Sequence, residues 1–284
     1  ASDSFGDSRT LYHKGDTLRD YGIQHILKQD DVYIAAAGTR ILKSDNGLKW
    51  RVAFNALSTS DLRKTIFEHD YLIAYGDGPY YRSTDLGKTW TPSDSSWSIT
   101  GAAYGNNTFV FIDQNYTVKV DADTLQETLI QAPGMYDVAY AGSTFYGIRD
   151  TKEEGEFIFY LYRLFSSGWV RVCEYNASNL PYCLRAAGSR LFFGEGYSTC
   201  EFKMDPGSSD FTWLYPYIDV YGQLVDVCAL GQQSDTPQVL SRAASLSDDS
   251  DAYAATSSGL YYLGDESVLL ESLSGLDVSG LRPS

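Results

Sequence analysis

Residues Tyr80–Trp90 read YYRSTDLGKTW, which is a pair of aromatic residues followed by the pattern Ser-x-Asp-x-Gly-x-x-Trp. The side chains of Ser83 and Asp85 can accept hydrogen bonds from the backbone N–H groups of a tight turn. Gly87 can supply a positive φ that a side chain would penalise. Trp90, directly after the turn, can cover the neighbouring layer and bury a large apolar area. The stretch therefore predicts a β-hairpin turn that carries its own apolar anchor.

The same frame recurs at Ile41–Trp50, which reads ILKSDNGLKW and has Lys43 in the place of Ser83. Two copies in frame make the pattern specific, and it resembles the Asp-box, or BNR repeat, of sialidase-like β-propellers. In later parts of the chain the turn pattern decays while the hairpins remain, which is expected of a turn that supports the fold and carries no chemistry. The residues to which we assign this structural role are Asp45, Gly47, Trp50, Ser83, Asp85, Gly87 and Trp90.

Short apolar or aromatic runs, bounded by Gly, Asn, Asp or Ser, recur along the chain and show no sustained helical period. Six of them open a hairpin-like unit, and these units begin at Ile23, Lys64, Gly101, Asp137, Leu184 and Leu224. The starts are spaced by roughly 36 to 47 residues, within the range of propeller blades of four short strands each. The sequence therefore predicts an all-β fold, a β-propeller of six four-stranded antiparallel blades, in which each small sheet is buried against the next.

The expected propeller occupies residues 1–284 as a single domain. Residues 1–20 are an N-terminal segment, and we expect its strand near Leu11 to close the ring beside Ser267–Glu271. Residues 231–250 are read as an insertion in the last blade. Seven blades are the alternative, if Gln238–Leu240 starts another sheet.

The composition is that of an ordinary globular chain and argues against two classes of partner. Hydrophobic residues make up 43% of the sequence, charged residues make up 21%, and the formal net charge is −15. A chain this acidic lacks the basic footprint that nucleic acid or an anionic lipid surface requires. No apolar run is long enough for a membrane-spanning helix. We therefore expect neither nucleic-acid binding nor insertion into a membrane.

An extracellular, cell-surface or virion location is expected. The chain begins at Ala1 with a polar segment, which fits a mature exported protein or a cytoplasmic chain that lost its initiator Met. Three N-x-S/T triplets, which begin at Asn106, Asn115 and Asn176, favour export.

The four cysteines are too few and too scattered for a disulfide framework. Cys183 and Cys200 fall in expected strands of one blade. Either a disulfide joins them across that blade, or they are buried thiols.

The loops before the first strand and after the second strand of a blade emerge at one end, where propellers generally bind ligands. Aromatic residues that we predict to bind a ligand there are Trp97, Tyr116, Tyr136, Tyr182, Tyr197, Tyr217 and Tyr221. Carboxylates that could form a catalytic pair there are Asp77, Asp150, Glu195 and Asp219. Aromatic rings beside carboxylates suit sugar rings, and they also suit a protein interface. The alternative is that these rings pack between blades.

Signals of a metal site, a cofactor or an activated nucleophile are missing from the sequence. His13, His25 and His69 have no ligand spacing, and no Cys pair has zinc spacing. Neither a Gly-rich phosphate loop nor a Gly-x-Ser-x-Gly elbow occurs. We therefore expect no cofactor and no metal.

Sialidases, the best-known enzymes with Asp-boxes, hold a carboxylated sugar with three arginines, one of them in an Arg-Ile-Pro-like motif. This chain lacks that motif, and Arg40 and Arg63 lie in different contexts. Our hypothesis is therefore a non-enzymatic module that recognises a glycan or a protein over the Tyr-rich loops, as part of an exported, cell-surface or phage tail-like assembly. The alternative is a glycoside hydrolase that uses two of the carboxylates named above.

Overall fold

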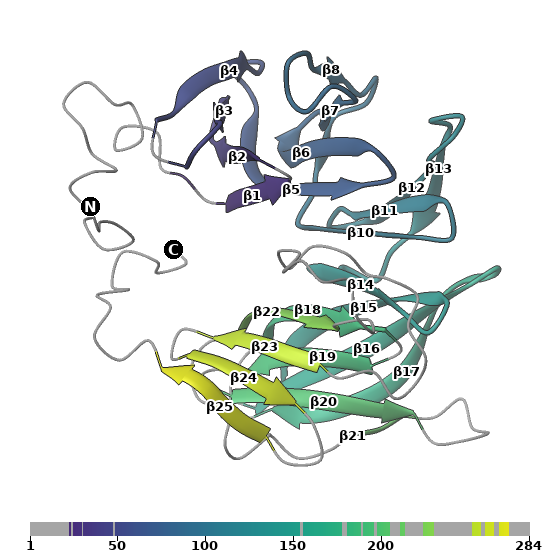
Figure 1. Cartoon of the computed structure of the whole chain (residues 1–284). Helices are drawn as coiled ribbons and strands as arrows, with labels where there is room; N and C mark the ends of the chain where they lie inside the picture. Colours follow the sequence, from purple (N-terminus) through teal and green to yellow (C-terminus); the bar gives the residue numbers. More distant parts are fainter. Residues whose placement is uncertain are drawn as a thin grey trace. The chain divides into compact units, whose positions relative to one another are not determined.

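The computed structural model describes residues 23, 25–29, 31–47, 49–153, 156–177, 181–188, 190–195, 198–204, 211–213, 224–229, 252–256, 259–263 and 267–272. These residues form strands, turns and bends, and none of them is helical. The strands assemble into six antiparallel sheets (Figure 1). The expected all-β fold of small antiparallel sheets is confirmed.

The chain divides into two compact units, and the first contains the described residues up to Ile99. Its sheet 1 has the order β1-β2-β3-β4, with strands His25–Gln29, Val32–Ala37, Arg40–Ser44 and Arg51–Asn55. Its sheet 2 has the order β5-β6-β7-β8, with strands Asp61–Glu68, Tyr71–Gly78, Tyr81–Ser83 and Thr91–Pro92. A further short strand, β9 (Trp97–Ser98), pairs with β6.

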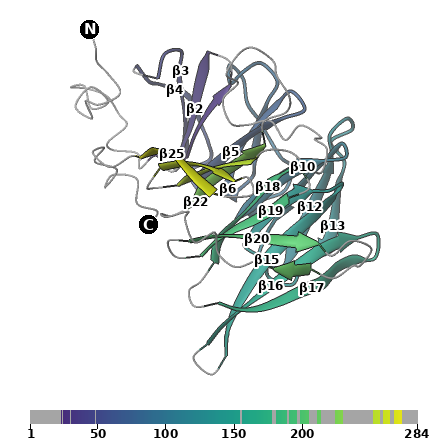
Figure 2. The same cartoon turned by 60° about the horizontal axis from the view of Figure 1, so that its bottom comes forward.

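The second unit begins at Thr100 and contains four sheets of four strands each (Figure 2). Sheet 3 comprises β10 (Gly101–Gly105), β11 (Thr108–Ile112), β12 (Tyr116–Asp121) and β13 (Glu127–Gln131). Sheet 4 comprises β14 (Asp137–Ala141), β15 (Thr144–Glu153), β16 (Glu156–Phe165) and β17 (Gly168–Ala177). Sheet 5 comprises β18 (Pro181–Ala187), β19 (Arg190–Glu195), β20 (Ser198–Met204) and β21 (Phe211–Trp213). Sheet 6 comprises β22 (Leu224–Ala229), β23 (Ala252–Thr256), β24 (Gly259–Leu263) and β25 (Ser267–Ser272).

Tight turns join the first two strands of several sheets where the sequence predicts them. His69 and Asp70 both have positive φ, 49° and 61°, and so do Asn106 and Asn107, at 46° and 56°. Two consecutive positive φ values give the two-residue hairpin turn whose twist matches that of the flanking strands. Asn and Asp tolerate this conformation better than other residues with side chains. These polar pairs therefore set the register of the hairpins.

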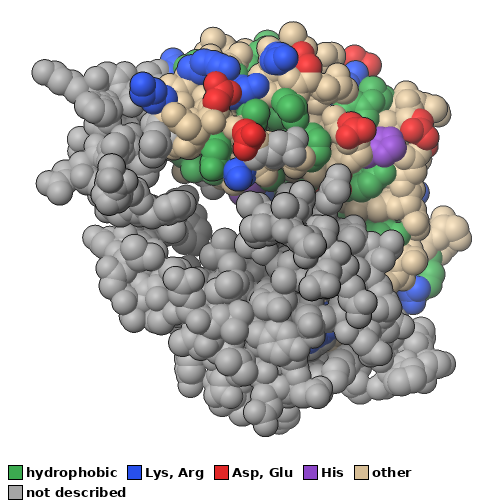
Figure 3. All heavy atoms as spheres, in the orientation of Figure 1, with side chains coloured by type: hydrophobic (Ala, Val, Ile, Leu, Met, Phe, Trp, Pro, Cys, Tyr) green, Lys and Arg blue, Asp and Glu red, His purple; other side chains and the backbone are tan. Residues whose placement is uncertain are grey.

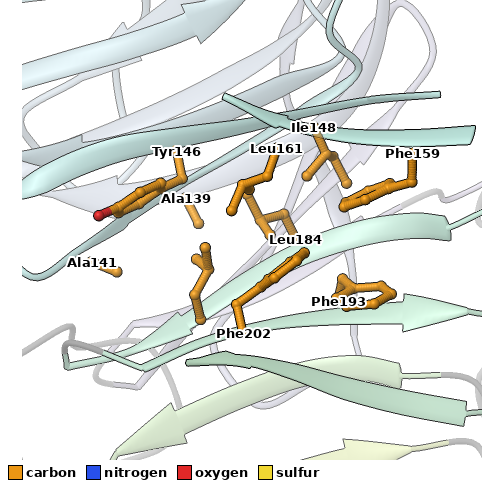
Figure 4. Close-up of a cluster of buried hydrophobic side chains, with 10 residues drawn as sticks. Ala139, Ala141, Tyr146, Ile148, Phe159, Leu161, Leu184, Phe193 and Phe202 are labelled. Atoms are coloured by element: carbon orange, nitrogen blue, oxygen red, sulfur yellow. The ribbon is translucent and has the colours of Figure 1, made fainter. Parts of the chain in front are cut away.

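Side chains from neighbouring sheets share hydrophobic cores within each unit. In the first unit, Ile34 of sheet 1 and Leu62 and Leu72 of sheet 2 are at most 1% exposed and lie in one cluster. In the second unit, sheets 4 and 5 bury a cluster that Figure 4 shows, in which Phe159 stacks on Phe193 at 5.1 Å between ring centroids. Stacking of small sheets, which buries faces that one sheet alone would expose, is thus observed within each unit.

Several expectations concern residues that the structure does not describe. The closing strand near Leu11, the insertion at residues 231–250 and the segment Gln238–Leu240 all lie outside the described residues. The described residues form six sheets, the number that the sequence predicts. That residues 1–284 make a single domain remains a prediction.

Of the two alternatives that the sequence leaves open for Cys183 and Cys200, the structure excludes the disulfide. Cys183 lies in β18 and Cys200 in β20, and β19 runs between these two strands. Strands two apart in a sheet are about 9.6 Å from each other, whereas a disulfide needs Cα atoms within about 7 Å. The sequence places both residues in strands of one blade but does not give the order of those strands, which is why both alternatives stayed open. Cys183 is buried.

Candidate functional site

The turn after β7 is held by side chains of its own sequence. Ser83 Oγ accepts a hydrogen bond from the Gly87 N–H at 2.9 Å and donates to Asp85 Oδ1 at 2.8 Å. Asp85 Oδ1 also accepts from the N–H groups of Lys88 and Thr89 at 2.9 Å, and Oδ2 accepts from Thr89 Oγ1 at 2.7 Å. These bonds, those from Thr89 first, hold the pKa of the Asp85 carboxyl well below its ordinary value because they stabilise the ionised form. Asp85 is therefore fully engaged as an acceptor within the turn.

The turn after β3 is the counterpart of the turn after β7. Its residues, however, match those of the turn after β7 with a shift of one position from the alignment made on the sequence. Tyr33, the second residue of β2, lies opposite Ser44, and Leu72, the second residue of β6, lies opposite Ser83. Ser44, and not Lys43, is therefore the structural equivalent of Ser83. The sequence alignment matched the two glycines and the two tryptophans. The segment from Ser44 to Gly47 is one residue shorter than the segment from Ser83 to Gly87, so the residues before the glycine were matched wrongly.

Asn46 takes the part of Asp85 in this shorter turn. Ser44 Oγ donates to Asn46 Oδ1 at 3.2 Å, and Asn46 Oδ1 accepts from the Lys49 N–H at 2.9 Å. Asp45, to which the frame assigned the structural role, is exposed and lies 3.8 Å from the equally exposed Arg51 guanidinium. The structural carboxylate expected at Asp45 is thus replaced by the amide of the next residue.

The tryptophans after the two turns pack differently. Trp90 is 8% exposed in the core between sheets 1 and 2, 6.4 Å from Phe54 between ring centroids. Trp50 is half-buried against the other face of sheet 1, edge-on to Tyr33. The indole N–H of Trp50 donates to the Gly47 carbonyl oxygen at 3.0 Å, whereas that of Trp90 meets no acceptor in the described part of the chain. Both rings act as apolar anchors, and the second is buried more deeply.

Lys43 links sheet 1 to the second turn. Its side chain is 4% exposed, and Nζ donates a hydrogen bond to the Leu86 carbonyl oxygen at 2.6 Å. Burial lowers the pKa of the Lys43 amine, and the positive charge of Arg51 lowers it further. Both turns and this lysine therefore belong to the packing of the first unit, away from the strand ends considered next.

Asp77, a predicted catalytic carboxylate, lies near the loop end of β6. It pairs with Asp61 of β5 across the sheet, and Arg63 forms ion pairs with both carboxylates, at 3.0 Å with that of Asp61. Ser98 Oγ donates a hydrogen bond to the other oxygen of Asp77. The Arg63 and Asp77 side chains are 36% and 37% exposed, so the cluster is reachable from solvent. Both Asp77 oxygens are occupied by donors of the protein itself.

Two glycines let other backbone approach this end of β6. A Cβ on Gly76 would lie 1.9 Å from the Asp61 carbonyl oxygen, which leaves no room for a side chain. Gly78 has a φ of 97° and lies opposite Trp97 of β9. The structure thereby brings Trp97, a predicted ligand-binding residue, next to the strand end that carries Asp77.

Tyr136 and Asp150, two further predicted site residues, lie in the second unit. The Tyr136 N–H donates to the Ile148 carbonyl oxygen at 3.0 Å, and the ring packs against the cluster of sheets 4 and 5. Burial first, and then the negative charges of Asp150 and Asp137, raise the pKa of the Tyr136 hydroxyl. Tyr136 is therefore mainly a packing residue, which is the alternative that the sequence left open for these rings.

Asp137 is buried between the first strands of sheets 4 and 5. It is 4% exposed, and its Oδ1 accepts from the Val138 N–H at 3.0 Å. Its Oδ2 accepts from the Leu184 N–H and from the Arg185 guanidinium, both at 2.9 Å. A buried carboxylate is tolerated only with such partners. Asp137 thus accepts backbone N–H groups from β14 of sheet 4 and from β18 of sheet 5, and it joins these two sheets.

His25 makes an analogous link in the first unit. It is the first residue of β1, as Asp137 is the first residue of β14. Its Nδ1 accepts from the Thr65 N–H at 3.3 Å and lies 2.9 Å from Thr65 Oγ1. Both residues therefore serve the contact between inner strands.

Tyr116 opens β12 and is 44% exposed. The preceding turn is closed by the Asn115 N–H, which donates to Asp113 Oδ1 at 3.1 Å, and by the Asp113 N–H, which donates to the Tyr116 carbonyl oxygen at 2.8 Å. Of the predicted aromatic residues whose side chains the structure describes, Tyr116 presents its ring most openly, since Trp97 and Tyr136 are half-buried.

The other predicted site residues have no described side chain. Tyr182 lies within β18 and Glu195 ends β19, but only their backbone is described. The positions outside the described residues are Tyr197, Tyr217, Asp219 and Tyr221.

Sequence reasoning overlooked the residues that organise the two carboxylate clusters. Asp61 and Arg63 surround Asp77, and Asp137 and Arg185 form the buried pair. A signal for the first set was available, because the start of one strand and the end of the next must lie opposite each other in a hairpin. A signal for Asp137 was also available, because it is a carboxylate at the start of an otherwise apolar strand.

Both signs of charge are present on the described part of the surface. Figure 3 shows basic side chains gathered toward the upper left of that part and acidic ones scattered among hydrophobic ones. Within the described residues, no group of three or more His, Cys, Asp and Glu side chains could hold a metal ion. The same residues include no helix that is long and apolar enough to span a membrane.

Comparison with known proteins identifies the fold. No family model and no curated protein matches the chain. Among solved structures, the chain is similar to the Pan2 WD40 domain of Neurospora crassa, with a TM-score of 0.60 at 11% identity over 87% of this chain and 77% of that one. It is also similar to the N-terminal domain of Nup159, with a TM-score of 0.52 at 11% identity over 87% of this chain and 75% of that one.

The extracellular domain of a hybrid two-component system of B. thetaiotaomicron is similar too, with a TM-score of 0.59 at 11% identity. The match covers 89% of this chain and only 33% of that one, so this chain corresponds to about a third of its length. Together with the six small sheets of the described residues, five of four strands and one of five, these likenesses show that the chain has a β-propeller fold.

Proposed function

We propose that the chain is a non-enzymatic recognition module that binds a glycan or a protein partner at the loop ends of its sheets. It would be a non-catalytic relative of the Asp-box propellers and part of a larger exported, cell-surface or virion assembly. The observation that carries the proposal is the state of Asp77, whose two oxygens are engaged by Arg63 and Ser98. A carboxylate held in this way is placed to shape a binding surface, whereas a general acid or base needs an oxygen directed at its substrate.

The surroundings of Asp77 support recognition of polar ligands. Trp97 lies beside the Asp61–Arg63–Asp77 cluster of the first unit. In the second unit, taken by itself, Tyr116 is exposed at the start of the third strand of sheet 3. Aromatic faces can cover sugar C–H groups while carboxylates and a guanidinium bind hydroxyls. The same combination of aromatic and Arg side chains is enriched in the centres of protein interfaces.

Two of the similar solved structures come from a protein that binds a partner protein and from an extracellular domain. The N-terminal domain of Nup159 is one, and a further similar structure holds S. cerevisiae Dbp5 bound to Nup159. The extracellular domain of the two-component system is the other. These likenesses suggest a protein partner and an extracellular location for this chain, and the experiment below addresses the partner.

A glycan array probed with the labelled full chain, combined with a hydrolysis assay on 4-methylumbelliferyl glycosides, tests the proposal. We expect saturable binding without turnover, and Trp97→Ala and Tyr116→Ala should weaken it. The matched control is Phe165→Ala, because Phe165 is 38% exposed, similar to the 44% of Tyr116, but lies at the opposite end of its sheet. Turnover that is lost in Asp77→Asn would overturn the proposal in favour of a glycoside hydrolase. Capture of a purified protein with no sugar bound would select the protein-binding form.

A further inference from the structure

The outermost strand of each sheet has one edge that no other described strand covers. Such an edge presents unpaired N–H and C=O groups and can pair with a strand from another chain, so proteins shorten it, interrupt it with proline or distort it with a bulge. Two of the six outer strands are short: β8 has two residues, one of them Pro92, and β21 has three.

Three further outer strands carry a bulge. In β4 the pairing skips Ala53, because Ile41 lies opposite Phe54 and Leu42 opposite Val52. In β17 it skips Val172, and in β25 it skips Leu270. The extra residue disrupts the alternation of backbone groups along the edge and increases its twist. These three strands are therefore poor templates for another strand.

β13 is the exception among the six. Its five residues, Glu127–Gln131, pair with β12 in a continuous register from Val120 opposite Glu127 to Tyr116 opposite Gln131. Its Thr128, Leu129 and Gln131 are exposed, and Leu129 is 52% exposed. A regular strand with an apolar, largely exposed side chain at its centre has none of the features that protect the other outer strands.

The direction of the free backbone groups follows from the hydrogen bonds at the two ends of the pair. The Ala132 N–H donates to the Asn115 carbonyl oxygen, and the Asp121 N–H donates to the Gln126 carbonyl oxygen. Because bonded and non-bonded pairs alternate in an antiparallel ladder, Thr128 and Ile130 direct their backbone groups at β12. Leu129 and Gln131 therefore direct theirs away from sheet 3.

We propose that β13 is a docking edge at which a positively charged, extended segment of a partner protein adds a fifth strand to sheet 3. Backbone hydrogen bonds to Leu129 and Gln131 would give affinity, and an apolar partner residue beside Leu129 would give specificity. The charge of the partner follows from the carboxylates around the edge: Glu127 in the strand, and Asp121 and Asp123 in the turn before it. A second copy of this chain is disfavoured as the occupant, because each copy carries a net charge of −15.

The test uses the full chain and a fluorescein-labelled basic peptide, Lys-Thr-Val-Arg-Val-Thr-Lys, in fluorescence anisotropy. Two control peptides keep its length: Glu-Thr-Val-Glu-Val-Thr-Glu reverses the charge, and Lys-Thr-Pro-Arg-Pro-Thr-Lys removes backbone donors. Leu129→Pro blocks the outward N–H without removing a bond to β12. Leu129→Lys replaces the exposed apolar side chain with a positive charge, which disfavours strand pairing and repels a basic peptide. It is the second test variant if Leu129→Pro does not fold. Val170→Lys is the matched control, since Val170 is 45% exposed on the bulged β17.

We expect saturable binding of the basic peptide, weakened at least about tenfold by either Leu129 substitution and unchanged by Val170→Lys. Both control peptides should bind at least about tenfold more weakly. Hydrogen exchange should slow at the Leu129 and Gln131 amides when the basic peptide binds. The proposal is overturned if this peptide does not bind saturably, if Leu129→Lys binds it as well as the unsubstituted chain, or if the protected amides lie elsewhere. Dimerisation of the chain that Leu129→Lys abolishes would also overturn it, because the occupant would then be a second copy.

Discussion

The two turns of the first unit look alike in sequence and differ in how they are held. In the turn of sheet 2, one carboxylate, Asp85, accepts from two backbone N–H groups and two hydroxyls. In the turn of sheet 1, which is one residue shorter before its glycine, the acceptor is an uncharged amide oxygen, that of Asn46, which accepts from the Lys49 N–H and the Ser44 hydroxyl. A turn motif is therefore defined by the register of the strand that leads into it and by the backbone donors that it must satisfy. The spacing of its glycine and tryptophan is a weaker guide.

The largest difference between the turns should lie in their tryptophans. Trp90→Ala removes a ring that is 8% exposed and should lower the free energy of unfolding by about 3–5 kcal/mol, the range for truncating a buried aromatic residue. Trp50→Ala removes a half-buried ring together with one hydrogen bond and should cost about 1–3 kcal/mol. Urea denaturation followed by circular dichroism measures both. Equal losses would contradict the difference in burial, and Phe165→Ala controls for loss of an exposed ring.

Both turn glycines have a positive φ, but their surroundings differ. Gly87 has a φ of 76°, and a Cβ there would lie 2.9 Å from Ile34 Cδ1, whereas Gly47 has a φ of 72° and its Cβ would lie 3.4 Å from the Tyr33 ring. Gly47→Ala should therefore cost about 1–2 kcal/mol for the left-handed conformation alone. Gly87→Ala should cost about 1 kcal/mol more, because Ile34 must also move. The same denaturation measurement ranks the two: equal costs would show that the Ile34 side chain yields freely, and the reverse order would contradict the prediction.

The shifted alignment of the first turn predicts unequal roles for two neighbouring residues. Asn46→Ala removes the acceptor for the Lys49 N–H and should cost about 1 kcal/mol, as the loss of a side-chain cap does. Asp45→Ala removes only an exposed contact with Arg51 at 3.8 Å and should change the free energy of unfolding by less than about 0.5 kcal/mol. If Asp45→Ala proves the more costly, the frame based on glycine and tryptophan was right after all. Thermal unfolding of the two variants side by side is sufficient.

The sequence predicts the repeated parts of the fold and misses what depends on register. Hairpins such as the one at His69 and Asp70 are local, so their turn residues and strand patterns identify them. The shift from Lys43 to Ser44 was missed because the shorter turn keeps the glycine and the tryptophan of the pattern. Since side chains alternate between the two faces of a strand, an alignment that is wrong by one residue assigns each of them to the wrong face. The choice between a disulfide and two thiols at Cys183 and Cys200 stayed open for a similar reason, since strand order is a property of the assembled sheet.

The candidate site is predictable only in part for a related reason. Asp77 and Trp97 lie at the same end of β6, which follows from the strand order, and their part in binding stays a prediction. Whether a carboxylate is available or engaged depends on partners from elsewhere in the chain, such as the Arg63 and Ser98 that hold Asp77. Asp137 binds Arg185, a residue of another sheet, and no local pattern connects the two.

The smallest expected effect separates the two turns by their charge. The pKa of Asp85 is held below its ordinary value of 3.8, so the folded state binds this proton more weakly than the unfolded state does. The stability that Asp85 contributes is therefore present above about pH 5 and is lost progressively as the pH falls below it. Other carboxylates titrate in the same range, so the informative quantity is the difference in free energy of unfolding between the unsubstituted chain and Asp85→Asn, measured from pH 6 to pH 2.5 by urea denaturation. This difference should shrink as the pH falls. In the other turn, Asn46→Asp should introduce a dependence of the same sign but smaller, because the negative charge of the neighbouring Asp45 would oppose ionisation of the new carboxyl group. A difference for Asp85→Asn that stays constant over this range would mean that the bonds to Asp85 do not persist in solution, and the two turns would then be held alike.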